Sequence, residues 1–166
     1  FLDTTVSGSV TYSYRVTASS DPNGYCESPP SPCNTAVPTG ECTLLPDFRG
    51  IVAAGSEGTA GCATSLSWEA GSALCAGDLV YNIYRSTTSG FTPGAGNLIE
   101  SCVTNTFFDD TTVAGGVANY YVVRAEDDTV GSGGPCRTGN EDSNSIQQSG
   151  LLPGIDPTGP GIEGQG

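Results

Sequence analysis

Apolar and polar residues alternate along much of the chain with a period of two, which is typical of strands with one buried face, and not with the 3.6-residue period of a helix. In residues 63–70, Leu66 and Trp68 fall on one side of an extended chain and polar residues on the other. The predicted strands of this region are residues 48–54, 63–70, 79–85, a short one near 97–101, 106–110, 118–126 and 143–149. The apolar residues expected to share buried faces are Leu66, Trp68, Tyr81, Ile83, Tyr121, Val123 and Ala125.

An internal repeat links the start of the chain to this region. A shift of 107 residues lays Phe1–Ala18 over Phe108–Ala125 without a gap, and ten of the eighteen positions are identical. The identical residues of the first copy are Phe1, Asp3, Thr4, Thr5, Val6, Gly8, Val10, Tyr14, Val16 and Ala18. A repeat of about 100 residues built from short strands has the size of one β-sandwich module.

The buried-face pattern resembles the fibronectin type III module. The residues that carry the resemblance are Trp68 in the second strand, Tyr81 and Ile83 in the third, and Val113 followed by Tyr121, Val123 and Ala125. The stretch "YNIYRSTTSGFTP" is similar to secreted bacterial members. The resemblance implies an all-β, immunoglobulin-like Greek-key sandwich in tandem repeat. Residues 48–149 would form a complete module, 1–38 the last strands of a preceding module, 39–47 a linker, and 150–166 a Pro- and Gly-rich tail or linker.

The resemblance also predicts a tyrosine at the start of the sixth strand, whose hydroxyl braces the preceding corner. Tyr12 stands there in the first copy, but Asn119 does in the second. Either Tyr120 takes over the role in the second copy, or that corner is looser.

The first copy holds too few strands to bury both faces of a sandwich, since an isolated two-stranded ribbon is marginal in water. We expect the remaining strands to come from upstream chain or from a neighbouring molecule. Strand donation by a neighbour builds filaments when the contact runs head to tail.

The charge and hydrophobicity of the chain limit the kinds of molecule that it is expected to bind. The chain has 18 acidic and 5 basic residues, and its net charge of -13 argues against nucleic acids and anionic membranes. No stretch reaches the ~20 apolar residues needed to cross a bilayer, so no membrane insertion is expected. Adjacent modules, copies of the chain itself or an extracellular polymer are the expected partners.

The seven cysteines include no C-x-x-C pair, which favours disulfides in an oxidising compartment over metal ligation. Cys26 and Cys33 are predicted to form a local bridge. The loops of the complete module would bring Cys42, Cys75, Cys102 and Cys136 to one end, where three pairings are open. Cys62 would lie at the opposite end and is the residue predicted to be unpaired or bonded to another chain.

Acidic residues flank the loop after the sixth predicted strand: Glu126, Asp127, Asp128, Glu141 and Asp142. Calcium prefers such clustered carboxylates, although the spacing does not match an EF-hand. A solvated acidic surface is the simpler interpretation and is favoured. No other cofactor is expected.

The chain contains no histidine, lysine or methionine, so the usual imidazole base and Schiff-base lysine are both absent. We therefore expect a non-enzymatic, extracellular or cell-surface module that acts as a structural spacer, adhesion element or filament subunit. The alternative is an accessory module that positions the catalytic domain of a secreted bacterial hydrolase on its substrate.

Overall fold

The computed structural model describes residues 1–20, 26–56, 63–75, 77–129 and 133–152. Every helix or strand in these ranges is a β-strand, so the predicted all-β class is confirmed. The described ranges hold no helix that is long and apolar enough to cross a membrane. The chain divides into two units, Phe1–Leu44 and Leu45–Gly166.

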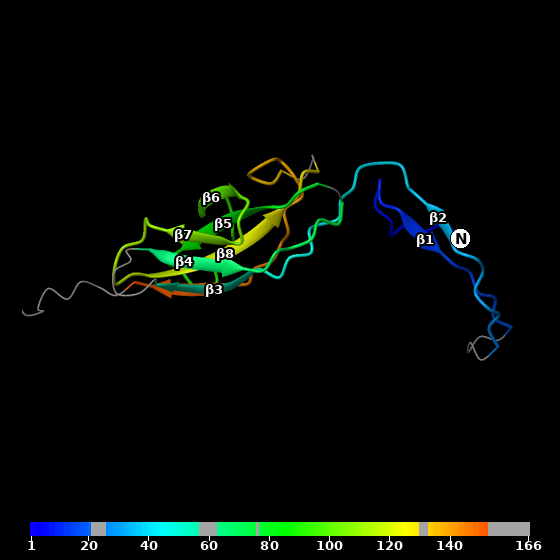
Figure 1. Ribbon diagram of the computed structural model, residues 1–166, viewed down its shortest axis with the longest axis horizontal. Coiled ribbons are helices and arrows are strands. Elements are labelled where there is room, and N and C mark those ends of the chain that lie inside the picture. Colours follow the sequence, from blue (N-terminus) through cyan, green and yellow to red (C-terminus); the bar gives the residue numbers. More distant parts are fainter. Residues whose placement is uncertain (21–25, 57–62, 76, 130–132, 153–166) are drawn as a thin grey trace, which may run out of the picture. The chain divides into compact units, whose positions relative to one another are not determined.

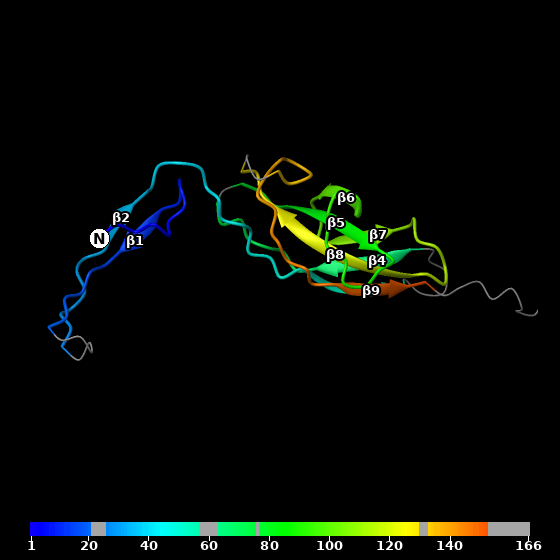
Figure 2. The same cartoon turned by 180° about the vertical axis from the view of Figure 1, so that it is seen from behind.

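The larger unit is a sandwich of two antiparallel sheets (Figures 1 and 2). One sheet has the order β3 (Ile51–Ser56), β4 (Thr64–Trp68), β7 (Phe107–Asp110). The other has the order β6 (Leu98–Val103), β5 (Val80–Ser86), β8 (Ala118–Glu126), β9 (Gln148–Leu151). The two central strands of the second sheet, β5 and β8, pair over their full seven-residue overlap.

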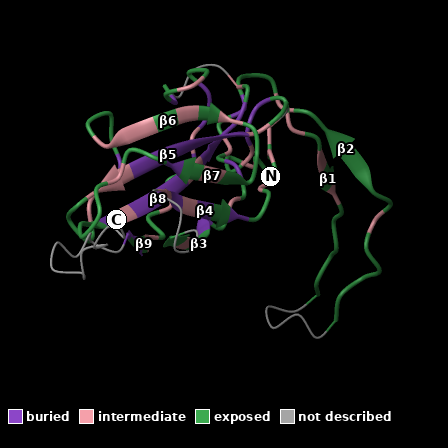
Figure 3. Cartoon of the chain, turned by 60° about the vertical axis from the view of Figure 1, so that its left-hand side comes forward, coloured by how far each residue is buried: buried purple, intermediate pink, exposed green. Residues whose placement is uncertain are grey.

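The hydrophobic core lies between the two sheets and is built from alternate residues of β3, β4, β5 and β8. In Figure 3, β5 and β8 are coloured mostly as buried. All seven apolar residues predicted to share buried faces belong to this core, together with Ile51. Trp68 packs edge-on against Tyr81, with 5.4 Å between the ring centres. The period-two pattern therefore identified the buried faces correctly.

Six of the seven strands predicted in this unit lie within three residues of their observed ends, but the last prediction, 143–149, is wrong by several residues. The observed β9 begins at Gln148 and ends at Leu151. Side chains explain the late start. Asn144 donates its amide to the Val123 carbonyl, and Arg124 Nε donates to the Asn144 carbonyl, so side-chain bonds replace the backbone ladder before β9.

The smaller unit contains a two-stranded ribbon of β1 (Tyr12–Tyr14) and β2 (Asn34–Ala36), paired in the register Tyr12↔Ala36. Backbone hydrogen bonds continue the ribbon past the strand ends, from Ser31 N to Val16 O and from Ser28 N to Ala18 O. Residues 1–3, which match the end of the predicted fifth strand, form no strand here. Their counterparts in β7 are ordered by pairing with β4, and the described part of the smaller unit has no such partner.

We expect Ile83→Ala to lower the free energy of unfolding by about 2–5 kcal/mol, because it leaves a cavity in a fully buried position of β5. Urea denaturation followed by the fluorescence of Trp68, the only tryptophan of the chain, measures the change. Val52→Ala is the control, because Val52 is exposed and its truncation should cost within about 0.5 kcal/mol. Equal effects of the two substitutions would contradict this description of the core.

Candidate functional site

Glu126, the last residue of β8, organises the loop that leads to β9. Its side chain is fully buried. The carboxylate accepts hydrogen bonds from Asn82 Nδ2 at 2.7 Å and from the backbone N–H groups of Cys136, Arg137 and Gly139 at 2.9, 2.6 and 3.0 Å. Burial acts to raise the pKa of Glu126, but these four hydrogen bonds outweigh it and hold the pKa below its ordinary value of 4.5.

The other four predicted calcium ligands are also occupied by protein donors. Thr129 and Asn140 donate to Asp127, and Arg137 donates to Asp128. Tyr84, Asn82 and Arg124 donate to Glu141. The backbone N–H groups of Ala125 and Asn144 donate to Asp142. In the described ranges no three acidic or cysteine side chains are grouped so that they could hold a metal ion. The acids instead tie the loop to the ends of β5 and β8.

One disulfide, Cys102–Cys136, joins β6 to this same loop across 34 residues of sequence. Cys42 and Cys75 are also disulfide-bonded. Cys62 lies outside the described residues. The predicted bridge between Cys26 and Cys33 is not formed, and both side chains are exposed.

The reason is the shape of the ribbon. Residues 26–33 run antiparallel to residues 16–20 as one extended arm. Seven extended residues span roughly 23 Å, whereas the Cα atoms of a disulfide lie within about 7 Å of each other. The two cysteines therefore sit far apart on one arm and not across from each other.

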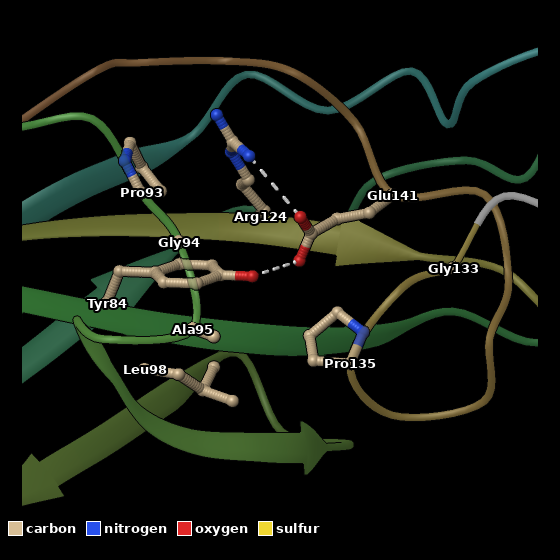
Figure 4. A pocket seen from close by; sticks show the side chains of 9 residues that line it. All are labelled: Tyr84, Pro93, Gly94, Ala95, Leu98, Arg124, Gly133, Pro135 and Glu141. Carbon is tan, nitrogen blue, oxygen red and sulfur yellow. Dashed lines mark hydrogen bonds and ion pairs between the residues drawn. The ribbon is translucent and has the colours of Figure 1, made fainter.

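A pocket of about 240 Å³ opens beside the loop, lined by Tyr84, Arg124 and Glu141 together with Pro93, Gly94, Ala95, Leu98, Gly133 and Pro135 (Figure 4). Its polar side chains bind one another. Tyr84 donates its hydroxyl to Glu141 at 2.6 Å, Arg124 contacts the other carboxylate oxygen at 3.3 Å, and the guanidinium lies 5.8 Å from the Tyr84 ring centre. This arrangement stiffens the outer face of β5 and β8.

A second buried carboxylate, Asp110 at the end of β7, ties three segments together and is only 2% exposed. It accepts hydrogen bonds from Tyr121 Oη at 3.0 Å, from Arg85 at 2.6 Å, and from the backbone N–H and hydroxyl of Thr112 at 3.0 and 2.7 Å. Burial acts to raise the pKa of Asp110, but the bonds from Thr112 and Arg85 keep it below its ordinary value. Burial also raises the pKa of Tyr121 to about 12.

The same corner occurs in the smaller unit, 107 residues earlier. Asp3 accepts hydrogen bonds from the backbone N–H and hydroxyl of Thr5 at 2.9 and 2.6 Å and from Tyr14 Oη at 3.3 Å. The backbone matches too. Ser9 has a φ of 61° and donates its N–H to Pro38, as Gly116, with a φ of 76°, donates to Leu152. The hydrogen bonds from threonine and tyrosine to the aspartate, and the backbone bond from residue 9 or 116, thus occur in both corners, whereas the bond from Arg85 occurs only at Asp110.

The tyrosine predicted to brace this corner does so in the smaller unit, where Tyr12 Oη accepts the Ser7 N–H at 2.9 Å. In the larger unit Asn119 is buried, and its side-chain amide donates to the Val117 carbonyl at 3.1 Å. Asn119 therefore holds its own turn by a hydrogen bond that reaches two residues along the chain, where the Tyr12 bond reaches five.

The two corners differ in what covers them. In the larger unit Tyr121, Val123 and Ala125 are completely buried, whereas in the smaller unit Phe1 is fully exposed and Val16 is 71% exposed. The uncovered face contains an open hollow of about 480 Å³ lined by Phe1, Asp3, Tyr14, Val16 and Ala36. We call these five residues the ribbon hollow.

No model of a protein family matches the chain, and no curated protein matches it. A Fn3-like protein from Clostridium thermocellum, known from its crystal structure, shares 30% sequence identity over 69% of this chain and 97% of its own, with a TM-score of 0.46. The chain belongs to the fibronectin type III-like family. The identity over nearly the whole of that protein and the seven-strand sandwich described above both support this assignment.

Sequence reasoning predicted most of the fibronectin type III-like core. It missed the two corner aspartates, Asp3 and Asp110, and the ion pair between Asp110 and Arg85. The signal was present in the repeat, since "DTT" occurs both at Asp3 and at Asp110. An aspartate followed two residues later by threonine is a turn in which the side chains bond the local backbone. What the sequence did not reveal is that an arginine from β5 meets this turn.

Glu126→Gln should lower the free energy of unfolding by about 1–3 kcal/mol, since a neutral amide is a poorer acceptor for the three backbone N–H groups that bind this buried side chain. Because the folded pKa of Glu126 lies below 4.5, its contribution is complete above that pH and is lost as the pH falls through the folded pKa. The difference between wild type and variant, measured by urea denaturation, should therefore shrink below pH 4.5.

Asp128→Asn is the matched control, because Asp128 and its partner Arg137 are 44% and 36% exposed. Its cost should stay within about 1 kcal/mol. A Glu126→Gln variant as stable as this control at neutral pH would show that Glu126 does not organise the loop.

Proposed function

We propose that the chain is a non-enzymatic structural or adhesion module of an extracellular protein, in which strands of a neighbouring module complete the ribbon. The observation that carries this proposal is the ribbon itself. It repeats the hairpin and corner of the complete module, yet its apolar face is uncovered.

An exposed face of this kind is unusual in a protein that works alone, since extended apolar patches commonly mark interaction sites. The identical residues Tyr14 and Val16 match core positions of the larger unit. A sandwich needs two sheets to bury such positions. The ribbon hollow is therefore best explained as half of an interface between β-sheets.

The neighbouring module can belong to the same polypeptide, which gives a tandem array, or to another molecule, which gives a filament by strand complementation. Both arrangements link modules end to end, and both fit a spacer or an adhesion stalk. The proposal concerns the completed ribbon that the two arrangements share.

An extracellular setting is supported by the disulfides. Cys42, Cys75, Cys102 and Cys136 are all oxidised, and such bonds persist mainly outside the cytoplasm. A non-enzymatic role is supported by the lack of histidine and lysine in the sequence and by the carboxylates of the larger unit, which hold loops. Glu126 and Asp110 each bind several donors of the protein itself.

The repeat provides a direct test, because residue 107 should precede Phe1 in the same register in which it precedes Phe108. We would join a second copy of residues 45–107 directly before Phe1, with Cys62, Cys75 and Cys102 of the added copy replaced by serine. The added strands should complete the ribbon, and hydrogen exchange of the amides from Tyr12 to Val16 should slow at least about 100-fold.

The control carries Ile83→Asp in the added copy only, which prevents that copy from packing. It should leave the exchange of the ribbon as fast as in the original chain. Fast exchange of the ribbon in the unmodified fusion, with the larger unit still folded, would refute the proposed function.

A further inference from the structure

The larger unit shows which strand the ribbon lacks. There β8 lies between β9 and β5. In the described part of the smaller unit, β1 pairs only with β2. The counterpart of β5 is therefore the neighbour that would cover the other edge of β1.

The register of the ribbon fits such a strand. Tyr14 faces Asn34 as Tyr121 faces Gln148, and Ser13 faces Thr35 as Tyr120 faces Ser149. β1 thus presents its free edge in the same alignment in which β8 presents its edge to β5.

The side chains that β5 brings to this edge are known. Tyr81 lies opposite Ala125, Ile83 opposite Val123, and Arg85 opposite Tyr121. The positions equivalent to these three partners are Ala18, Val16 and Tyr14. A strand in the place of β5 would set two apolar side chains against Ala18 and Val16 and a third side chain against Tyr14.

The third of these β5 positions, Arg85, carries a positive charge. Arg85 and Tyr121 both reach Asp110 Oδ2, at 2.6 and 3.0 Å. In the ribbon, Tyr14 reaches Asp3 Oδ2 at 3.3 Å. No ion pair to Asp3 occurs among the residues that the structure describes, whereas its counterpart Asp110 is paired with Arg85. A carboxylate that becomes buried without a cation or enough donors is destabilising.

We propose that the ribbon hollow is the acceptor site for one extended strand of the pattern apolar-x-apolar-x-Arg, whose arginine pairs with Asp3. This inference rests on the proposed function and adds the identity of the strand that completes the ribbon. The apolar residues cover Val16 and Ala18, and the arginine selects the partner, because an apolar face alone accepts many sequences.

A folded second copy of the chain does not supply this strand from its larger unit. Both edges of β5 are already paired, one with β6 and the other with β8. The donor is a segment of the same chemistry whose neighbours are not yet paired, as in the strands of an incomplete module.

The test uses the intact 166-residue chain and a synthetic peptide of residues 78–88, "DLVYNIYRSTT", with a second peptide that carries Arg85→Gln. Binding is measured by the anisotropy of labelled peptide and located by the amide resonances of β1. We expect the arginine peptide to bind the ribbon about tenfold more tightly than the glutamine peptide, as for one charge-assisted hydrogen bond.

Two protein variants distinguish the ion pair between the peptide arginine and Asp3 from nonspecific binding of the peptide. Asp3→Asn should abolish the difference between the peptides, while Glu27→Gln, an exposed acid elsewhere on the ribbon, should retain it. The amide resonance of Ser7, which bonds Tyr12, reports whether the corner of the Asp3→Asn variant stays folded. If it does not, Thr5→Ala at the same corner keeps the carboxylate and should retain the preference for arginine.

Equal affinity of the two peptides, preference for arginine in folded Asp3→Asn, or no change in the β1 resonances at millimolar peptide would each overturn the inference. So would self-association through the ribbon that the arginine peptide does not compete with. In any of these cases, slow exchange in the fusion of residues 45–107 to Phe1 would still support the proposed function, so the two failures are distinguishable.

Discussion

The antiparallel pairing of β5 with β8 fixes the position of most other features of the larger unit. These strands supply five of the eight core residues, and each end of the pair is secured by a buried carboxylate. Glu126 closes one end by binding Asn82 of β5 and the loop after β8. Asp110 closes the other by binding Arg85 of β5 and Tyr121 of β8. Both carboxylates are satisfied by donors from neighbouring strands, which is the condition for burying a charge at tolerable cost.

The ribbon of the smaller unit shows which features form when a strand equivalent to β5 is not paired with it. Its register is that of β8 and β9, and its turn holds Asp3 as the larger unit holds Asp110 at the end of β7. These features therefore form without β5. Burial of Val16 does not, because a two-stranded ribbon has no second layer to pack against. Local turn chemistry thus sets the shape of the hairpin, whereas a partner strand is needed to build a core on it.

The sequence predicted the parts of the fold that depend on period-two alternation. Leu66, Trp68, Tyr81 and Val123 were assigned to the buried face, and they lie in the core. The start of β9 was missed because Asn144 substitutes side-chain bonds for backbone ones, and composition does not reveal such a replacement. The Cys26 bridge was predicted from proximity in sequence, which fails when the intervening residues run extended.

The identity of Asp3 and Asp110 bears on why the corner is repeated at all. An aspartate in a turn needs only its own threonine, and Asp3 has that bond from Thr5. An asparagine or serine could form a similar turn, yet neither would attract a guanidinium from a neighbouring strand. In the larger unit the extra charge is used, since Arg85 ties β5 to the corner. The same charge in the ribbon lies beside an uncovered apolar face, where the proposed strand would bring its arginine.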